Sequence, residues 1–348
     1  MTRLCFLTIA CAISVAAVAH HSPNVHFDRS DVVEIAGTLT AIDWQNPHTI
    51  LTLETADQDG EPVVWIGETK ASTQLYRAGL GPEIFSVGDR LRMAGFRGRR
   101  NQHAMFVTNV LLVDGRELIA ENLAGPRWTD EMAGTSLGDY QAARIAEGPD
   151  APTGLFRVWS RDGSASGADD TERMLWVDGY PLTEQARIDQ ENWDPVADNP
   201  YINCQNGMPA IMDQGFPLEF VRAGEDILLY LEELDTVRRI HMSSTASAED
   251  SEPSAFGFST GRWDGDTLEV TTTDIDWPWF DPSGIRQTDA LHLVERFTPS
   301  EDGRVLRYEL TATDPEIFTE PVELDRIWIW VPGEQIRPYE CSWTGEGL

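Results

Sequence analysis

The sequence predicts an all-β protein with two domains: an OB-like small barrel, then a larger antiparallel up-and-down (lipocalin-like) β-barrel or half-barrel. Two observations predict this arrangement. Residues 32–112 give β-rich runs in the order three strands, one helix and two strands, which is the order of an OB-type barrel. Residues 217–342 give strand-like runs joined by tight turns, without a helical pattern between them. A chain of 348 residues is ordinary for two domains.

We place the first domain at residues 20–119. Its β-rich alternation predicts five strands, and its short helix stops at Gly79 and Gly81. The Asn46-Pro47 step marks the first turn. The predicted elements are, in order, Val32–Trp44, Thr49–Glu54, Pro62–Gly67, the helix Ser72–Ala78, Arg90–Phe96 and Ala104–Leu112.

We assign residues 120–153 to an irregular linker that includes a short helix, and residues 154–348 to the second domain. Turn sequences such as Asp264-Gly265 separate the strands of this domain. The predicted strands are Gly154–Ser160, Leu218–Arg222, Ile227–Leu231, Val237–Met242, Ala255–Trp263, Leu268–Thr273, Ala290–Phe297, Val305–Thr313, Val322–Val331 and Ile336–Ser342.

Residues 1–19 have the pattern of a cleaved signal peptide. Arg3 supplies the positive charge, Leu4–Val18 is apolar, and Ala17-Val18-Ala19 fits the small-x-small cleavage rule. The apolar run is too short for a comfortable membrane span, and the later sequence predicts no other span. We therefore expect a periplasmic or secreted protein whose mature chain begins at His20.

Signal cleavage changes the cysteine count. Cys5 and Cys11 leave with the signal, so Cys204 and Cys341 remain. Two cysteines in an oxidising compartment predict a disulfide between them.

The formal net charge of −32 bears on the partners. Phosphate backbones and anionic lipids repel such a chain, so nucleic acid and membrane surfaces are excluded as predicted partners. We expect a small-molecule ligand instead, and the sequence names no protein partner.

Five short segments, spread over almost the whole mature chain, resemble an uncharacterised family of exported proteins of Gram-negative bacteria. Members of that family start with His-His-Ser after the signal and carry a W-x-NPH turn. The resemblance implies export and two β domains, and it supplies no mechanism. The matching segments are His20-His21-Ser22, Trp44-Gln45-Asn46-Pro47-His48, Asp235-Thr236-Val237-Arg238-Arg239, Gly261-Arg262-Trp263-Asp264-Gly265-Asp266-Thr267-Leu268 and Leu291-His292-Leu293-Val294-Glu295-Arg296.

The mature N-terminus is a candidate copper site. A terminal His chelates through its amine and its ring, and nitrogen ligands suit Cu(II). His20 is the candidate chelating residue, with His26, His48 or His103 as the partner. The alternative is that cleavage simply exposes a His that binds no metal.

Polar residues of the second domain are candidates for catalysis. On a regular strand His292 and Glu295 face opposite sides, so they do not form a pair. If the His292 side faces the barrel interior, His292 can act as acid or base with Tyr230 or Arg239. If the Glu295 side faces inward, Glu295 can pair with an arginine. The alternative is a structural polar network or solvent-facing charge.

Aromatic residues of the stretch Gly257–Phe297 are candidate ligand contacts. They are Trp263, Trp277, Trp279 and Phe280. Such clusters bind sugars, sterols or aryl groups by stacking, and they also fill β cores.

Three functions are consistent with these features. The leading hypothesis is binding of a small apolar or aromatic molecule in a pocket of the C-terminal barrel, with lyase, isomerase or hydrolase chemistry as an extension. The second is periplasmic copper binding through His20. The third is a non-catalytic envelope module for protein partners.

The copper hypothesis predicts the outcome of intact-mass and bound-metal analysis on protein exported by a Gram-negative host. The mass should start at His20, and about one copper per chain should remain bound, since the site needs the free amine of that residue. An added residue before His20 should abolish binding, and unchanged copper affinity in that variant would contradict the hypothesis.

Overall fold

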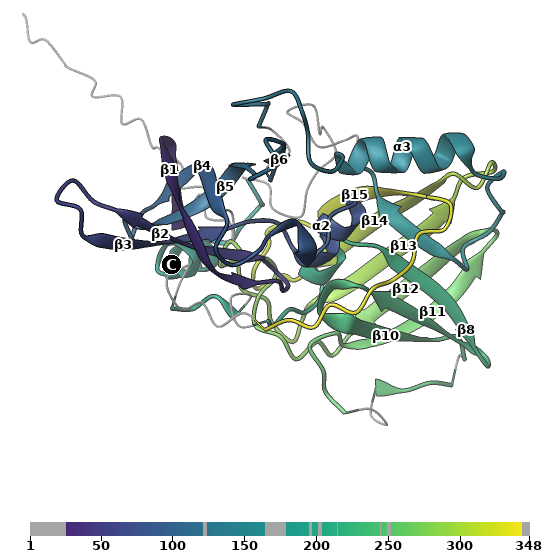
Figure 1. Ribbon diagram of the computed structural model, residues 1–348. Coiled ribbons are helices and arrows are strands. Elements are labelled where there is room, and N and C mark those ends of the chain that lie inside the picture. The colour runs from purple at the N-terminus through teal and green to yellow at the C-terminus, as the bar shows by residue number, and fades with distance from the viewer. Residues whose placement is uncertain are drawn as a thin grey trace, which may run out of the picture.

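Two β-barrels built from separate parts of the chain make up the protein, and they lie side by side in the computed structural model (Figure 1). The structure describes residues 26–120, 124–163, 179–194, 197–200, 204–213, 215–243, 245–248 and 252–342. The predicted fold class is confirmed. Within the described residues, every helix is too short or too polar to cross a bilayer.

The smaller barrel has the strand pairing of an OB fold. Strand β1 pairs with β2 and β4, β2 pairs with β3, and β4 pairs with β5, all antiparallel. A parallel β3–β5 pairing closes the ring, and the short β6 extends β5. Helix α2 lies between β3 and β4 in sequence, as predicted. The bounds are β1 Phe27–Asp43, β2 Ile50–Ala56, β3 Pro62–Glu68, α2 Ser72–Arg77, η1 Pro82–Ile84, β4 Arg90–Gly98, β5 Ala104–Leu111 and β6 Glu117–Ile119.

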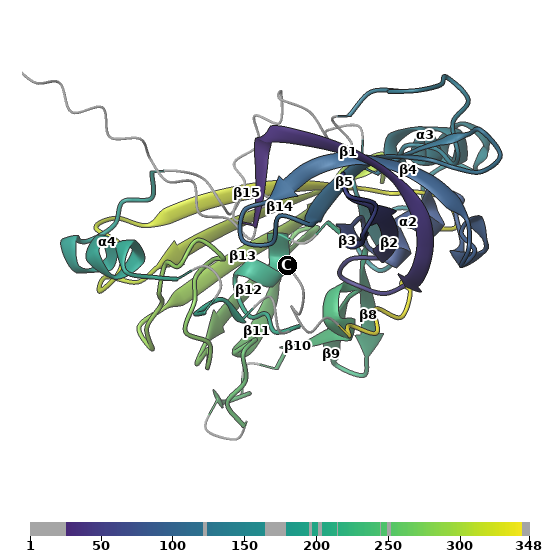
Figure 2. The ribbon, with the colours of Figure 1, turned by 60° about the vertical axis from the view of Figure 1, so that its left-hand side comes forward.

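Strand β1 is long and curved, which allows it to pair with both β2 and β4 (Figure 2). Its register shifts between Asp28 and Val32 against β4, and between Leu39 and Ala41 against β2, and such bulges bend a strand. Gly37 lies where a Cβ atom would come within 2.5 Å of the Glu54 carbonyl oxygen. The curve therefore depends on local irregularity at these points.

The segment between the barrels is packed rather than extended. It carries α3, Leu137–Glu147, whose first turn is capped by Ser136: its Oγ accepts from the Asp139 N–H at 3.0 Å. Gln141 on α3 donates to the Arg161 carbonyl at 2.7 Å and accepts from the Gly163 N–H at 2.8 Å. Helix α3 is thereby attached to the larger barrel.

The larger barrel is closed by nine strands in the order β10-β11-β12-β13-β14-β15-β7-β8-β9. All neighbouring pairs are antiparallel except β10–β11, which is parallel. The predicted strand Ile336–Ser342 is not formed. This segment leaves the barrel and reaches the smaller domain, where Cys341 forms an isolated parallel β-bridge with Asn46. The bounds are β7 Val158–Arg161, α4 Glu184–Glu191, η3 Ala210–Asp213, β8 Leu218–Ala223, β9 Asp226–Leu231, η4 Glu233–Asp235, β10 Thr236–His241, β11 Phe258–Asp264, β12 Thr267–Thr273, β13 His292–Pro299, β14 Val305–Thr313 and β15 Val322–Ile329.

A buried ion pair occupies the lumen of this barrel. Arg238 on β10 donates to both carboxylate oxygens of Glu295 on β13, at 3.0 and 2.6 Å. Tyr308 on β14 donates its hydroxyl to the same carboxylate at 3.0 Å. All three side chains are at most 2% exposed. Burial opposes the charge of Arg238, but the attraction of Glu295 outweighs it and raises the pKa of the guanidinium.

The segment that precedes β8 also reaches the lumen. Met212 places its sulfur 3.2 Å from the Arg238 guanidinium, and Asp213 forms a buried ion pair with Arg326 of β15. Trp159 and Trp328 fill further space and are fully buried. Side chains therefore occupy the position where the sequence predicts a ligand pocket.

Arg238→Ala should lower the free energy of unfolding by about 3–5 kcal/mol, because it leaves the Glu295 carboxylate buried without its partner. Arg239→Ala is the matched control. Arg239 is the next residue on the same strand, but it is exposed and pairs with Asp226 at 3.0 Å, so its loss should cost less than about 1 kcal/mol. Urea unfolding measures both values, and similar losses would contradict a structural role for the lumen pair.

Candidate functional site: the cleft between the barrels

A buried arginine joins the two barrels. Arg77, in the last turn of α2, donates to both oxygens of Glu232, at 2.7 and 2.6 Å, and to Glu334 at 3.2 Å. Glu232 directly follows β9 of the larger barrel, and it also accepts the Arg337 N–H at 3.0 Å. Because Arg77 and Glu232 are nearly inaccessible to water, this bidentate pair fixes the orientation of one barrel on the other.

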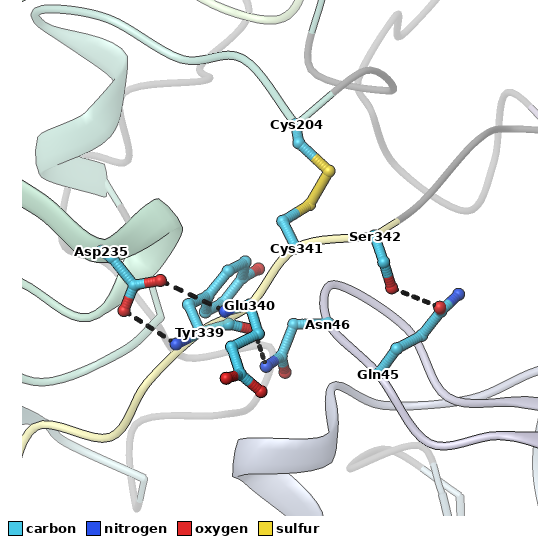
Figure 3. Close-up of a disulfide and its surroundings, with 8 residues drawn as sticks. All are labelled: Gln45, Asn46, Cys204, Asp235, Tyr339, Glu340, Cys341 and Ser342. Atoms are coloured by element: carbon cyan, nitrogen blue, oxygen red, sulfur yellow. Dashed lines mark hydrogen bonds between the residues drawn. A yellow bond between two sulfur atoms is a disulfide. The ribbon is translucent and has the colours of Figure 1, made fainter.

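The Asn46-Pro47 turn makes the second connection (Figure 3). Asn46 is buried, donates to the Tyr339 carbonyl, and accepts from Ser72 Oγ at 3.2 Å. The neighbouring Gln45 accepts from Ser342 Oγ at 2.6 Å. A short turn of the smaller barrel thus binds the C-terminal segment of the larger one.

The predicted disulfide between Cys204 and Cys341 is confirmed (Figure 3). Its Cα atoms are 6.0 Å apart, and it spans 137 residues of sequence. Two residues of the C-terminal segment beside Cys341 also bond to Asp235: its carboxylate accepts from the Tyr339 N–H at 2.9 Å and from the Glu340 N–H at 3.2 Å. The disulfide and these hydrogen bonds hold the C-terminal segment against the end of the larger barrel.

These connections enclose a cleft of about 240 Å³. One wall is aromatic: the rings of Phe216 and Tyr339 meet edge to face, with centroids 5.1 Å apart. Polar side chains face it from both barrels. The lining residues are Pro47, His48, Gln74, Cys204, Gln205, Asn206, Ala210, Phe216, Glu233, Leu234, Pro282, Tyr339 and Cys341.

Glu233 is the carboxyl of the cleft. It accepts from the Asn206 side-chain amide at 3.0 Å, and burial raises its pKa to about 7. The next two residues, Leu234 and Asp235, have φ of 56° and 50°, a backbone region that non-glycine residues enter rarely. This turn separates three acids: Glu232 points to Arg77, Asp235 binds the C-terminal segment, and Glu233 lines the cleft.

His48 lies on the opposite side of the cleft, beside Glu68. Its Nδ1 is 2.9 Å from the Thr69 carbonyl oxygen, so this nitrogen carries a proton. It also lies 3.3 Å from a Glu68 oxygen. Burial lowers the pKa of His48 and raises that of Glu68 to about 8, so we assign the neutral form to both near pH 7 despite their proximity.

The structure does not bring the predicted catalytic residues together. The Glu295 side of β13 faces inward, where Glu295 pairs with Arg238, whereas His292 is exposed on the outer side. Arg239 also faces outward, because it directly follows the inward Arg238. Tyr230 is half-buried on the outer side of β9, a strand separated from β13 by β10, β11 and β12.

The predicted aromatic ligand contacts have separate environments. Phe280 and Trp279 are buried in the core, and Trp277 is half-buried against it, with Gly207 beside its indole. Trp263 differs, because it is 42% exposed at the end of β11. The structure therefore makes three of the four residues part of the packing.

The predicted copper ligands remain separate in the described residues. His20 lies outside them, and His103 packs edge to face on Trp65 with centroids 5.3 Å apart. No group of three or more His, Cys, Asp or Glu side chains with metal-binding geometry occurs in the part of the chain that the structure describes. Copper binding through His20 stays a prediction.

Sequence reasoning missed the cleft residues Glu233, Asn206, Phe216 and Tyr339. Two signals lay nearby: the Asn46-Pro47-His48 turn, and the Asp235–Arg239 segment that directly follows Glu233 and Leu234. Both segments carry the resemblance to the exported family, but neither indicates that the two meet in space.

Comparison with known proteins finds a similarity in the N-terminal part of the chain. A family model described as "Family of unknown function (DUF6152)" matches residues 8–106, a range that contains His48, Glu68 and the whole of α2. No curated protein matches the chain. The matched range contributes one side of the cleft, and the rest of the lining comes from residues beyond it.

Replacement of Glu68 by Gln should change how stability depends on pH. The folded carboxyl keeps its proton up to about pH 8, whereas an unperturbed one ionises near 4.5. The stability contributed by Glu68 is therefore complete below about pH 4.5 and is lost as the pH rises through 8. From about pH 5 to about pH 8, the wild type should lose stability relative to Glu68→Gln, by at most ~1.4 kcal/mol per pH unit.

Urea unfolding at the two ends of this pH range tests the expectation. Glu61→Gln, at an exposed position before β3, is the control and should follow the wild type. A Glu68→Gln variant that also parallels the wild type would contradict the buried, protonated state of this carboxyl.

Proposed function

We propose that the protein binds a small neutral or cationic molecule with an apolar or aromatic part in the cleft between its barrels. The observation that carries this proposal is the combination of the Phe216–Tyr339 wall with Glu233, a carboxyl whose pKa is raised to about 7. Ligand sites are typically concave and mostly apolar, with a few placed polar groups. The cleft has this composition.

The charges of the cleft limit the ligand. Its described lining includes the carboxyl of Glu233 and no arginine or lysine. The chain as a whole carries a net charge of −32, which repels anions at long range. An anionic ligand would therefore meet repulsion without a local cation to offset it.

Glu233 can serve both ligand types. Near pH 7 its carboxyl is close to half ionised. The protonated form donates to a carbonyl or ether oxygen of a neutral ligand, and the ionised form accepts from an ammonium group. A pKa near the working pH is also what general acid–base chemistry needs, so any turnover of the ligand would be assigned to Glu233 rather than to His292.

The proposed ligand site lies at the end of the larger barrel rather than in its lumen. The Arg238–Glu295 pair and buried aromatic side chains occupy the lumen. The cleft instead lies where loops and chain ends meet, which is where binding residues concentrate. Its wall includes the Cys204–Cys341 disulfide, so an exported location, as the signal sequence predicts, is part of the proposal.

Benzylamine and benzyl alcohol are matched probes, because they share a ring and differ in charge. At about pH 8, Glu233→Gln should weaken benzylamine binding at least about tenfold and leave benzyl alcohol within about threefold. Gln74→Trp, which fills the cleft from α2, should block both. NMR titration measures the affinities, and Glu184→Gln, at an exposed position on α4, controls for net charge.

The proposal fails if neither probe binds the wild type, or if both bind Gln74→Trp as tightly as the wild type. Thermal unfolding of each variant separates a blocked cleft from a protein that no longer folds.

A further inference from the structure

A groove opens in the wall of the larger barrel where β10 ends. The parallel β10–β11 pairing includes two register pairs, Ile240 with Ser259 and His241 with Thr260. Strand β11 continues to Asp264 and, among the described strands, pairs there only with β12. The turn between β8 and β9 forms the facing side. The groove measures about 410 Å³ and is lined by Arg222, Gly224, Glu225, Asp226, Ile227, Met242, Gly261, Arg262 and Trp263.

Trp263 gives the groove a fixed aromatic surface. Its side chain is 42% exposed, although the residue lies on a regular strand. The ring of Phe156 packs behind it, with centroids 6.1 Å apart, and the Arg222 guanidinium lies 3.6 Å from the centre of the Phe156 ring. The indole therefore packs against Phe156, while a large part of its surface remains open to a ligand.

The polar groups of the groove are also held in place. Asp226 accepts from Arg239 at 3.0 Å and from the Met242 N–H at 3.2 Å, and it lies 3.4 Å from His241 Nδ1. Arg262 forms an ion pair with Glu269 of β12. Asp226 and Arg262 thus line the groove as oriented polar groups, and Met242 and Ile227 add apolar surface.

The charges of the lining balance. Arg222 and Arg262 offset Glu225 and Asp226, so the formal charge of the groove is zero. A charged ligand gains no net attraction there. The surface instead suits a neutral molecule that has one apolar face and a rim of hydrogen-bonding groups, since aromatic residues with polar neighbours bind such amphipathic partners.

We propose that this groove is a saccharide-binding site with Trp263 as the stacking platform. The apolar C–H face of a pyranose ring packs on the indole, and its hydroxyl groups bond to polar groups of the lining such as Arg222 and Asp226. This site is separate from the cleft: the groove lies at the Asp226 end of β9, and the cleft lies beyond the Leu231 end. The proposal therefore does not depend on the function proposed for the cleft.

An extended peptide is the competing occupant. It would add to the free edge of β11 through main-chain hydrogen bonds, as in β-strand addition. Such binding would depend on the backbone of residues 261–264 and would tolerate the loss of the indole. The two occupants therefore differ in their response to substitution of Trp263.

Saturation-transfer NMR and calorimetry on the full exported chain test the proposal with cellobiose, maltose, lactose and N,N′-diacetylchitobiose. At least one disaccharide should bind with a dissociation constant of about 1 mM or tighter. Trp263→Ala should weaken that binding at least about tenfold, and Trp263→Phe should recover part of it. Val237→Ala removes an exposed apolar side chain from β10, outside the groove, and should have no effect.

Absence of binding to all four disaccharides overturns the proposal. Binding that is unchanged in Trp263→Ala, or displaced by an unrelated extended peptide but not by a second saccharide, also overturns it. Thermal unfolding confirms that each variant is folded, as expected for a change at an exposed side chain.

Discussion

The buried pair between Arg77 and Glu232 is the interaction on which the arrangement of the two barrels depends. A buried guanidinium without its carboxylate is strongly unfavourable, so the interface is stable only when α2 and the end of β9 meet. Glu232 also binds the backbone N–H of Arg337, which brings the C-terminal segment to the same point. One carboxylate therefore positions three parts of the chain, and the cleft is the space that remains between them.

The packing of the larger barrel explains why the candidate site lies outside its lumen. Residues 204–213 contribute to both regions: Asn206 bonds to Glu233 in the cleft, while Met212 and Asp213 contact Arg238 and Arg326 inside the barrel. Because the lumen ion pairs need these neighbours, the segment cannot withdraw without exposing or isolating buried charge. The filled lumen thus acts as a rigid support for one wall of the cleft.

Local pattern was sufficient to predict most strands and the OB order of the first domain, because alternation reports which residues face a core. It could not predict the parallel β10–β11 pairing, since a buried strand shows the same alternation whether its neighbour is parallel or antiparallel. Local pattern also could not show which of Arg238 and Arg239 faces the lumen and pairs with Glu295. Parity shows that these two arginines face opposite sides, but the inward side is set by Glu295, which lies 57 residues away.

The cleft was beyond sequence reasoning for a related reason. Glu232, Glu233 and Asp235 belong to one acidic turn in a chain with 58 acidic residues, and nothing local distinguishes them. Their roles come from partners on distant segments: Arg77 for Glu232, Asn206 for Glu233, and the Tyr339 N–H for Asp235. Glu232 and Asp235 accept hydrogen bonds that connect separate segments of the chain, whereas burial raises the pKa of Glu233 in the cleft to about 7. An acidic residue thus becomes a structural hydrogen-bond acceptor or a titratable group according to tertiary contacts alone.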